Sequence, residues 1–127
     1  MKREIKFRLI HDNKIVGYER FDHGEWYYSR DGIQWNEHFI LHDDKDQYTG
    51  RKDRKGTEIY EGDLVIHPAF EFEEPSVGQV VFIHGSFLIT RKNWEKTFSF
   101  VQPEDINEFE VIGNLSEYSD LLQRDAL

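Results

Sequence analysis

The chain has 127 residues, of which 15% are aromatic and 32% are charged, and its formal net charge is −9. A chain of this length forms one domain, and its many large rings can bury a core, so the composition argues against a disordered protein. The negative charge disfavours binding to the phosphates of duplex DNA. The absence of cysteine excludes disulfides, thiolate nucleophiles and thiolate metal sites.

The N-terminal segment predicts a β-hairpin. Apolar and basic side chains alternate over residues 4–10, with the period of two that is typical of a half-buried strand. The apolar set is Ile5, Phe7 and Leu9, and the basic set is Lys6 and Arg8. A turn is expected at Asp12-Asn13, followed by a returning strand at residues 15–18.

Two further turn pairs follow at short spacing and predict a meander of short strands. The pairs are His23-Gly24 and Asp31-Gly32. The Asp-Gly form suits a tight hairpin. We expect strands at residues 26–29 and 33–35 on the two sides of this second turn.

The next segment predicts the end of an N-terminal lobe. Residues 39–41 are apolar and predict a short strand, and the charge run at residues 43–46 predicts a solvated loop. This loop would be the boundary between two lobes of the single domain, which spans residues 1–127. The expected lobes are residues 1–46 and 47–127.

The middle of the chain, residues 48–65, is punctuated by three glycines. Each can take positive φ without steric cost and therefore predicts a tight turn. Two tyrosines supply rings to bury between the turns, and an aspartate after the third glycine predicts a turn residue that bonds to its own backbone. This structural motif comprises Tyr48, Gly50, Gly56, Tyr60, Gly62 and Asp63.

The second half of the chain also predicts mainly strands. Residues 78–83 and 86–90 are strongly β-prone, with His84-Gly85 between them as a two-residue hairpin loop. Four further segments complete the prediction. Strands are expected at residues 94–100 and 110–112, an irregular loop at residues 68–75, and one short helix at residues 119–124.

Three separated segments form a recognisable combination. They are IKFR at residues 5–8, QYTGRKDRKGTEIYEGDLV at residues 47–65 and VIGNLSEYSDLL at residues 111–122. Together they resemble the YopX family of bacteriophage and prophage proteins, over essentially the whole chain. The resemblance implies a β-rich fold with an SH3-like barrel portion, an origin in temperate phages of Gram-positive hosts, and no catalytic motif. One departure is Ser119, which stands about where the family has a proline that opens the final helix.

Six histidines raise the question of a metal site. His38 and His42 are four residues apart, but the residues between them predict a strand, and four residues of strand span about 13 Å. Neither a His-x-His pair nor a His-Glu-x-x-His motif is present. We therefore expect no metal and no cofactor.

The carboxylates of the central segment raise the question of acid–base catalysis. They are Asp53, Glu58, Glu61 and Asp63. Four basic residues stand in the same stretch, so a charged turn explains the carboxylates equally well. The serines have no nucleophile-elbow motif around them, and Gly50 and Gly56 lack the Gly-Lys-Ser/Thr ending of a phosphate-binding loop. We expect no catalytic residue and no enzyme.

Exposed rings on a small β fold could stack on bases of single-stranded nucleic acid or contact a protein. The candidate binding aromatics are Trp26, Tyr28, Trp35 and Trp94. The same rings could instead form the core. The overall acidity disfavours nucleic acid, and the basic residues Arg91, Lys92 and Lys96 form only a local patch.

From these observations we expect a single mainly-β domain in which an N-terminal meander joins an SH3-like barrel capped by a short C-terminal helix. No apolar run is long enough for a signal peptide or a membrane span, so we expect a cytoplasmic protein of the bacterial host. The expected function is a non-enzymatic phage accessory protein that binds a protein partner or forms a homo-oligomer. The alternative is a small barrel that binds single-stranded nucleic acid.

Overall fold

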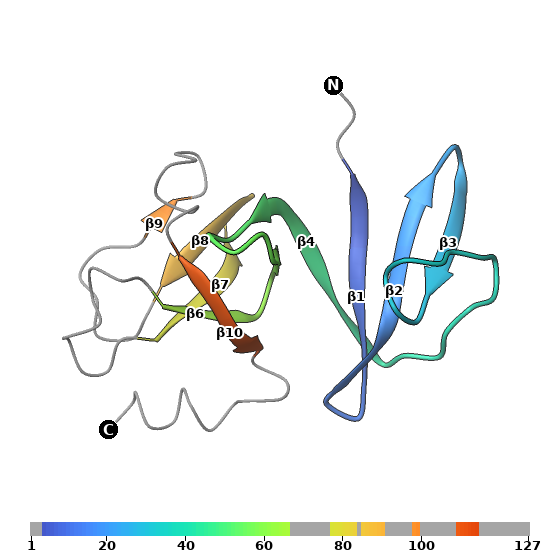
Figure 1. Ribbon diagram of the computed structural model, residues 1–127, viewed down its shortest axis with the longest axis horizontal. Helices are drawn as coiled ribbons and strands as arrows, with labels where there is room; N and C mark the ends of the chain where they lie inside the picture. The colour runs from blue at the N-terminus through green and yellow to red at the C-terminus, as the bar shows by residue number, and fades with distance from the viewer. Residues whose placement is uncertain (1–3, 67–76, 84, 91–97, 100–108, 115–127) are drawn as a thin grey trace.

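The protein folds into two antiparallel β-sheets that lie side by side (Figure 1). The computed structural model describes residues 4–66, 77–83, 85–90, 98–99 and 109–114. Within these residues all regular structure is β-strand, which confirms the mainly-β fold class. No helix in this part of the chain is long and apolar enough to cross a membrane.

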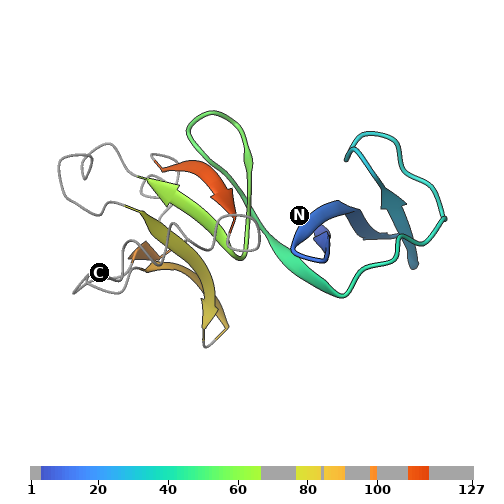
Figure 2. The ribbon, with the colours of Figure 1, turned by 90° about the horizontal axis from the view of Figure 1, so that it is seen from below.

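The first sheet has the strand order β3-β2-β1-β4-β5. Its strands are β1 (Ile5–His11), β2 (Lys14–Asp22), β3 (Glu25–Ser29), β4 (Asp44–Lys52) and β5 (Glu58–Tyr60). The central strand β1 pairs with β2 on one side and with β4 on the other. Strand β4 runs from this sheet towards the second one, so it joins the two halves of the molecule (Figures 1 and 2).

The second sheet has the strand order β10-β6-β7-β8-β9. Its strands are β6 (Asp63–Ile66), β7 (Gly78–Ile83), β8 (Ser86–Thr90), β9 (Phe98–Ser99) and β10 (Glu110–Asn114). Among the described strands, β10 and β9 are open edges of this sheet. The expected closed SH3-like barrel is therefore wrong for this part of the chain. A sheet closes into a barrel when its two edge strands pair with each other. Here β5, the strand before β6 in the chain, pairs with β4 of the first sheet instead.

The hydrophobic core belongs mainly to the second sheet. Its buried members are Ile59, Val65, Val80, Phe87, Ile89 and Phe109, with Val111 packed against them. Ile59 comes from β5, so the first sheet contributes to this core through its edge strand. Side chains alternate between the two faces of β7 and β8, which explains why only some of their residues belong to the core. Val80 pairs with Ile89, so both side chains lie on the same face of the sheet.

Three of the predicted hairpins are confirmed, and the one predicted at Asp31-Gly32 is not formed. At the β1–β2 turn, Asp12 and Asn13 have φ of 51° and 65°, as a two-residue turn with positive φ at both positions requires. At the β2–β3 turn, His23 and Gly24 adopt the same left-handed region. The β7–β8 hairpin also closes over two residues, because Ile83 pairs with Ser86.

The predicted turns of the central segment are also confirmed, with φ of 83°, 86° and 88° at Gly50, Gly56 and Gly62. The turn at residues 53–57 is organised by the buried Asp53. Its Oδ1 accepts hydrogen bonds from the backbone N–H groups of Lys55 and Thr57, at 2.9 and 2.8 Å. Its Oδ2 accepts from the N–H of Val111 at 2.9 Å and so ties this turn to β10.

Residues 30–43 form a loop, so the strands expected at residues 33–35 and 39–41 are wrong. The Asp31 carboxylate explains the first error. Its Oδ1 accepts hydrogen bonds from the N–H groups of Ile33 and Gln34, at 2.8 and 3.0 Å, which a strand would have used for its ladder. Only one isolated bridge, between Tyr28 and Asn36, returns to β3.

The charge run at residues 43–46 is not a loop throughout, because β4 begins at Asp44. Asp46 stands opposite Arg8 of β1 and accepts a hydrogen bond from its guanidinium, so this pair of opposite charges holds the strand in place. The expected lobe boundary at residue 46 falls inside β4. Several other predictions lie outside the described residues: the loop at 68–75, the strand at 94–97, Trp94, and the helix at 119–124.

Replacing Gly17 with alanine should destabilise the first sheet. A Cβ at this position of β2 would lie 2.7 Å from both Ile40 Cδ1 and the Ser29 carbonyl oxygen, and the backbone oxygen cannot move without shifting β3. We expect Gly17→Ala to lower the free energy of unfolding by about 1–3 kcal/mol in urea denaturation, the usual cost of overpacking. Lys14→Ala, at an exposed position of the same strand, is the control. An unchanged unfolding midpoint for Gly17→Ala would contradict the close packing of Ile40 on β2.

Candidate functional site

The first sheet buries basic side chains as well as apolar ones. The basic side chains of β1 are covered, since Lys6 is 9% exposed and Arg8 is 6% exposed. On the other face of the same strand, Ile5 is 44% exposed, whereas Leu9 is completely buried. The alternation that predicted a half-buried strand is therefore correct in its period, but β1 buries its basic side chains and leaves its apolar face open at the Ile5 end.

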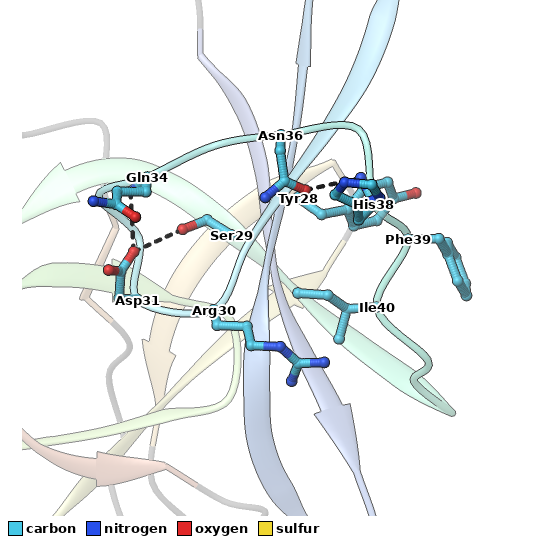
Figure 3. Close-up of a pocket in the computed structure, with 9 residues that line it drawn as sticks. All are labelled: Tyr28, Ser29, Arg30, Asp31, Gln34, Asn36, His38, Phe39 and Ile40. Atoms are coloured by element: carbon cyan, nitrogen blue, oxygen red, sulfur yellow. Dashed lines mark hydrogen bonds between the residues drawn. The ribbon is translucent and has the colours of Figure 1, made fainter.

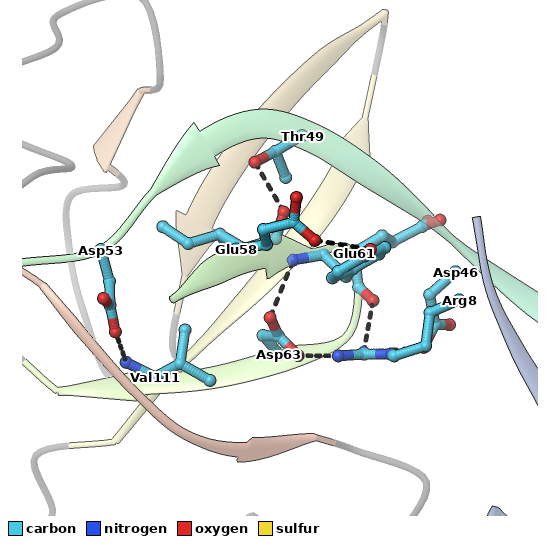
Figure 4. A network of polar contacts seen from close by, with 10 residues as sticks. Arg8, Asp46, Thr49, Asp53, Glu58, Glu61, Asp63 and Val111 are labelled. Carbon is cyan, nitrogen blue, oxygen red and sulfur yellow. Dashed lines mark hydrogen bonds and ion pairs between the residues drawn. The ribbon is translucent and has the colours of Figure 1, made fainter. Parts of the chain in front are cut away.

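Arg8 explains why the basic face of β1 is inside. Its guanidinium donates from Nε and Nη2 to Asp46 Oδ2 on β4, at 3.1 and 2.8 Å, and from Nη1 to Asp63 Oδ1 on β6, at 2.6 Å (Figure 4). One side chain of the first sheet thus binds the first strand of the second sheet. The guanidinium also lies 4.8 Å from the centre of the Tyr60 ring, which covers it on one side. We call Arg8, Asp46 and Asp63 the arginine clamp.

Asp63 is the most deeply buried member of the arginine clamp. Its Oδ2 accepts a hydrogen bond from the backbone N–H of Tyr60 at 2.8 Å, as expected for a turn residue after Gly62. Burial outweighs the neighbouring Arg8 charge and raises the pKa of Asp63 to about 6. Burial likewise raises the pKa of Asp46. The second contact of Asp63, to Arg8, could not be read from local sequence because 55 positions separate the two residues.

A second buried cation, Lys6, lies two residues before Arg8 on the same face of β1. Lys6 Nζ forms ion pairs with Glu58 of β5 and with Glu4, and it lies 4.7 Å from the centre of the Tyr48 ring. Tyr60 also donates a hydrogen bond to Glu58, at 3.1 Å. The two motif tyrosines, Tyr48 and Tyr60, are therefore buried around the cations of β1.

The exposed face of the first sheet is aromatic. We define the aromatic face by the side chains of Ile5, Phe7, Phe21, Trp26 and Tyr28. Trp26 lies near its centre, 6.2 Å from the ring of Phe7 and 5.0 Å from the ring of Phe21 between centroids. Trp26 is 40% exposed and Phe21 is 37% exposed. These rings form one contiguous surface because the register pairs Ile5 with Phe21 and Phe21 with Trp26.

One ion pair lies within the aromatic face. Lys45 Nζ of β4 binds Glu19 Oε1 of β2 at 2.7 Å and lies 4.5 Å from the centre of the Phe7 ring. The register of β1 to β4 places both Lys45 and Glu19 on this face. Their two charges neutralise each other beside the rings.

The structure separates the four candidate binding aromatics. Trp26 and Tyr28 belong to the aromatic face. Trp35 lies on the opposite side of the sheet, where the guanidinium of Arg20 is 4.3 Å from its ring centre. Trp94 lies outside the described residues. The residues that sequence reasoning missed are the charged ones, Arg8 and Lys45, whose partners are set by strand pairing.

Carboxylates and histidines do not converge on a metal site in the described part of the chain. His38 and His42 belong to the loop at residues 30–43 and not to a strand, which corrects the expected conformation of this segment. His42 Nδ1 lies 2.7 Å from the carbonyl oxygen of Ile40, a contact within the loop. The carboxylates of Asp53 and Asp63 are engaged by backbone N–H groups in two turns.

By its architecture the protein is an antiparallel β protein with two sheets, and the buried arginine clamp joins these sheets. The chain belongs to the YopX family: the family model described as YopX protein matches residues 8–123. This confirms the family assignment that the three sequence segments suggested. No curated protein matches the chain.

The fold is similar to that of a solved structure. It is described as the crystal structure of protein EF1440 from Enterococcus faecalis, with a TM-score of 0.51 and 18% sequence identity. The similarity covers 94% of this chain and 96% of that chain, so both sheets are included. At this level of identity the likeness concerns the fold alone.

Breaking the arginine clamp should cost more than breaking a surface ion pair. In Arg8→Met the apolar stem is kept, but the carboxylates of Asp46 and Asp63 stay buried without a cation. We expect a loss of about 3–5 kcal/mol in the free energy of unfolding at pH 7. Lys55→Met, which breaks the exposed pair of Lys55 with Glu110, is the control and should cost less than about 1 kcal/mol. Equal losses in urea titrations of the two variants would contradict the role of the clamp.

The titration of Asp63 provides a separate test. Its folded-state pKa of about 6 lies above the ordinary value of 3.8, so the folded chain binds this proton more tightly than the unfolded chain. The contribution of Asp63 to stability therefore increases as the pH falls from about 6 to about 4, and it decreases as the pH rises through that window. We expect the ¹³Cγ resonance of Asp63 to titrate near pH 6.

Asp31 is the control within the same NMR experiment. Hydrogen bonds from the N–H groups of Gln34 and Ile33 lower its pKa below the ordinary value. The Asp63 midpoint should therefore lie well above the Asp31 midpoint. A midpoint for Asp63 at or below that of Asp31 would show that Arg8 outweighs burial.

Proposed function

We propose that the protein is a non-enzymatic accessory protein of a bacteriophage or prophage, which acts in the bacterial cytoplasm by binding a protein surface through the aromatic face. One observation carries the proposal: the first sheet buries the basic side chains of β1 and leaves Ile5, Phe21 and Trp26 exposed on its other face. The phage origin is supported by the resemblance to phage and prophage proteins that the three sequence segments carry.

The exposed aromatic face is a costly feature for a protein that works alone. Burying apolar surface stabilises proteins by roughly 25 cal/mol per Å², and an isolated fold gains nothing from rings left in water. Contiguous exposed apolar patches mark interaction sites, and aromatic residues are enriched in the buried centres of protein interfaces. Trp26, with Phe7 and Phe21 on its two sides, has the composition of such a centre.

The charges of the aromatic face favour an apolar protein surface over nucleic acid. Proteins bind phosphates through cationic side chains that are not already paired with a carboxylate. Lys45 is engaged by Glu19, and a phosphate group would have to displace that carboxylate. The alternative of single-stranded nucleic acid, stacked on Trp26, therefore lacks the basic groove that such binding uses.

A second copy of the chain is the partner that this chemistry favours. Two molecules with a net charge of −9 repel each other, but the charges of Lys45 and Glu19 compensate each other beside the exposed rings. Two such faces can pack as sheets usually do, about 10 Å apart, with their rings interdigitated. The proposal of a non-enzymatic role is supported by the central carboxylates, which serve as turn and clamp residues.

Sedimentation equilibrium tests the proposal. We expect the wild-type chain to form a dimer, and Trp26→Glu to weaken the association at least about 100-fold, because it places an unpaired charge in the centre of the interface. Phe82→Glu is the matched control, because Phe82 is 42% exposed but lies on β7 of the second sheet. It should leave the dimer intact.

Two outcomes would overturn the proposal. A wild-type chain that stays monomeric at all concentrations would remove the second copy as the partner, and equal association of Trp26→Glu and wild type would place the interface elsewhere. Salt-dependent binding of a single-stranded oligonucleotide that Trp26→Glu abolishes would favour the alternative function.

A further inference from the structure

The loop between β3 and β4 lines a pocket. Of the residues that define the aromatic face, Tyr28 also lines this pocket. Its volume is about 350 Å³, at the small end of the range for ligand pockets (Figure 3). Its lining includes Tyr28, Arg30, Asp31, His38, Phe39 and Ile40.

The shape of this pocket is held by hydrogen bonds within the loop. The backbone of Tyr28 exchanges two hydrogen bonds with the backbone of Asn36, at 2.7 and 3.0 Å. Asn36 Oδ1 then accepts from the N–H of His38 at 2.8 Å (Figure 3). Ser29 Oγ accepts from the N–H of Gly32 at 2.8 Å. Because the backbone is fixed in this way, the pocket is formed before any ligand arrives, which lowers the entropy cost of binding.

One part of the pocket is apolar. The rings of Tyr28 and Phe39 lie 5.3 Å apart between centroids, in an edge-to-face arrangement. Ile40 is buried beside them and anchors the loop against β2 at Gly17. These three side chains offer a surface for a ring or a branched aliphatic group.

The polar part of the pocket is rich in donors. Arg30 is exposed, and its guanidinium has no ion-pair partner among the residues that the structure describes. The imidazole of His38 likewise has no hydrogen-bond partner within that part of the chain. Asp31 is the carboxylate of the lining, and its Oδ1 already accepts from Ser29 Oγ and from two backbone N–H groups. Among the described residues, the charged group of the lining that is left without a partner is therefore the Arg30 guanidinium.

We propose that this pocket binds a carboxylate carried on an aromatic or aliphatic group, either as a free small molecule or as the last residue of a peptide. The planar guanidinium of Arg30 matches a carboxylate through two parallel hydrogen bonds. The apolar group then lies against Phe39 and Tyr28. A phosphate is a poorer match, because one arginine meets a doubly charged group beside an apolar wall. This inference does not depend on the proposed function.

The experiment uses N-acetyl-L-phenylalanine as the probe and its C-terminal amide as the uncharged counterpart. Backbone amide shifts of Gly32, Ile33, Gln34 and His38 report on the pocket in two-dimensional NMR titrations of the whole chain. We expect the acid to shift these amides saturably and the amide probe to bind at least about tenfold more weakly, since it lacks the charge that pairs with Arg30.

Variants test the assigned cation. Arg30→Gln should lower the affinity for the acid at least about tenfold, whereas Lys14→Gln, which removes a positive charge at an exposed site outside the pocket, should leave it unchanged. Equal shifts with the acid and the amide probe, or equal affinity of Arg30→Gln and wild type, would overturn the proposal. So would shifts confined to residues outside the loop.

A second arm separates the two sources of the ligand. A hexapeptide ending in phenylalanine is compared with the same peptide amidated at its C-terminus. Binding of the free peptide far more tightly than the acetylated amino acid would identify a peptide end as the ligand. Equal binding of the two would identify a small carboxylate, because the pocket would then recognise only the terminal residue.

Discussion

The burial of Arg8 is the constraint on which the rest of the structure depends. A guanidinium cannot leave water without compensation, and here two carboxylates and the ring of Tyr60 provide it. Asp46 belongs to β4 and Asp63 to β6, so one cation specifies how the first sheet meets the start of the second. Removing the cation would leave two buried carboxylates, which is why the three residues act as a unit.

The same constraint determines which surface the protein presents. Side chains alternate along β1, so a strand that turns Lys6 and Arg8 inward must turn Ile5 and Phe7 outward. The aromatic face is thus a direct consequence of the arginine clamp. Ile5, Phe21 and Trp26 remain exposed on that face, and the proposed binding role rests on their exposure.

Local conformation could be predicted well from the sequence. The hairpin turns at Asp12-Asn13 and His23-Gly24, and the positive φ of Gly50, Gly56 and Gly62, follow from the chemistry of single residues and hold in the structure. The loop at residues 30–43 was mispredicted because the Asp31 carboxylate binds backbone N–H groups that a strand would need. The loop predicted at the start of β4 is wrong because Asp46 binds Arg8 of β1, which lies 38 positions away in the chain.

The sequence by itself determined the mainly-β fold, the family and the positions of the tight turns, because these depend on side-chain period and on residues that tolerate positive φ. The tertiary structure alone decided which face of the first sheet is buried, because both faces of β1 satisfy the same period of two. That choice was made by Asp46 and Asp63, which surround Arg8 only after β4 and β6 have been placed.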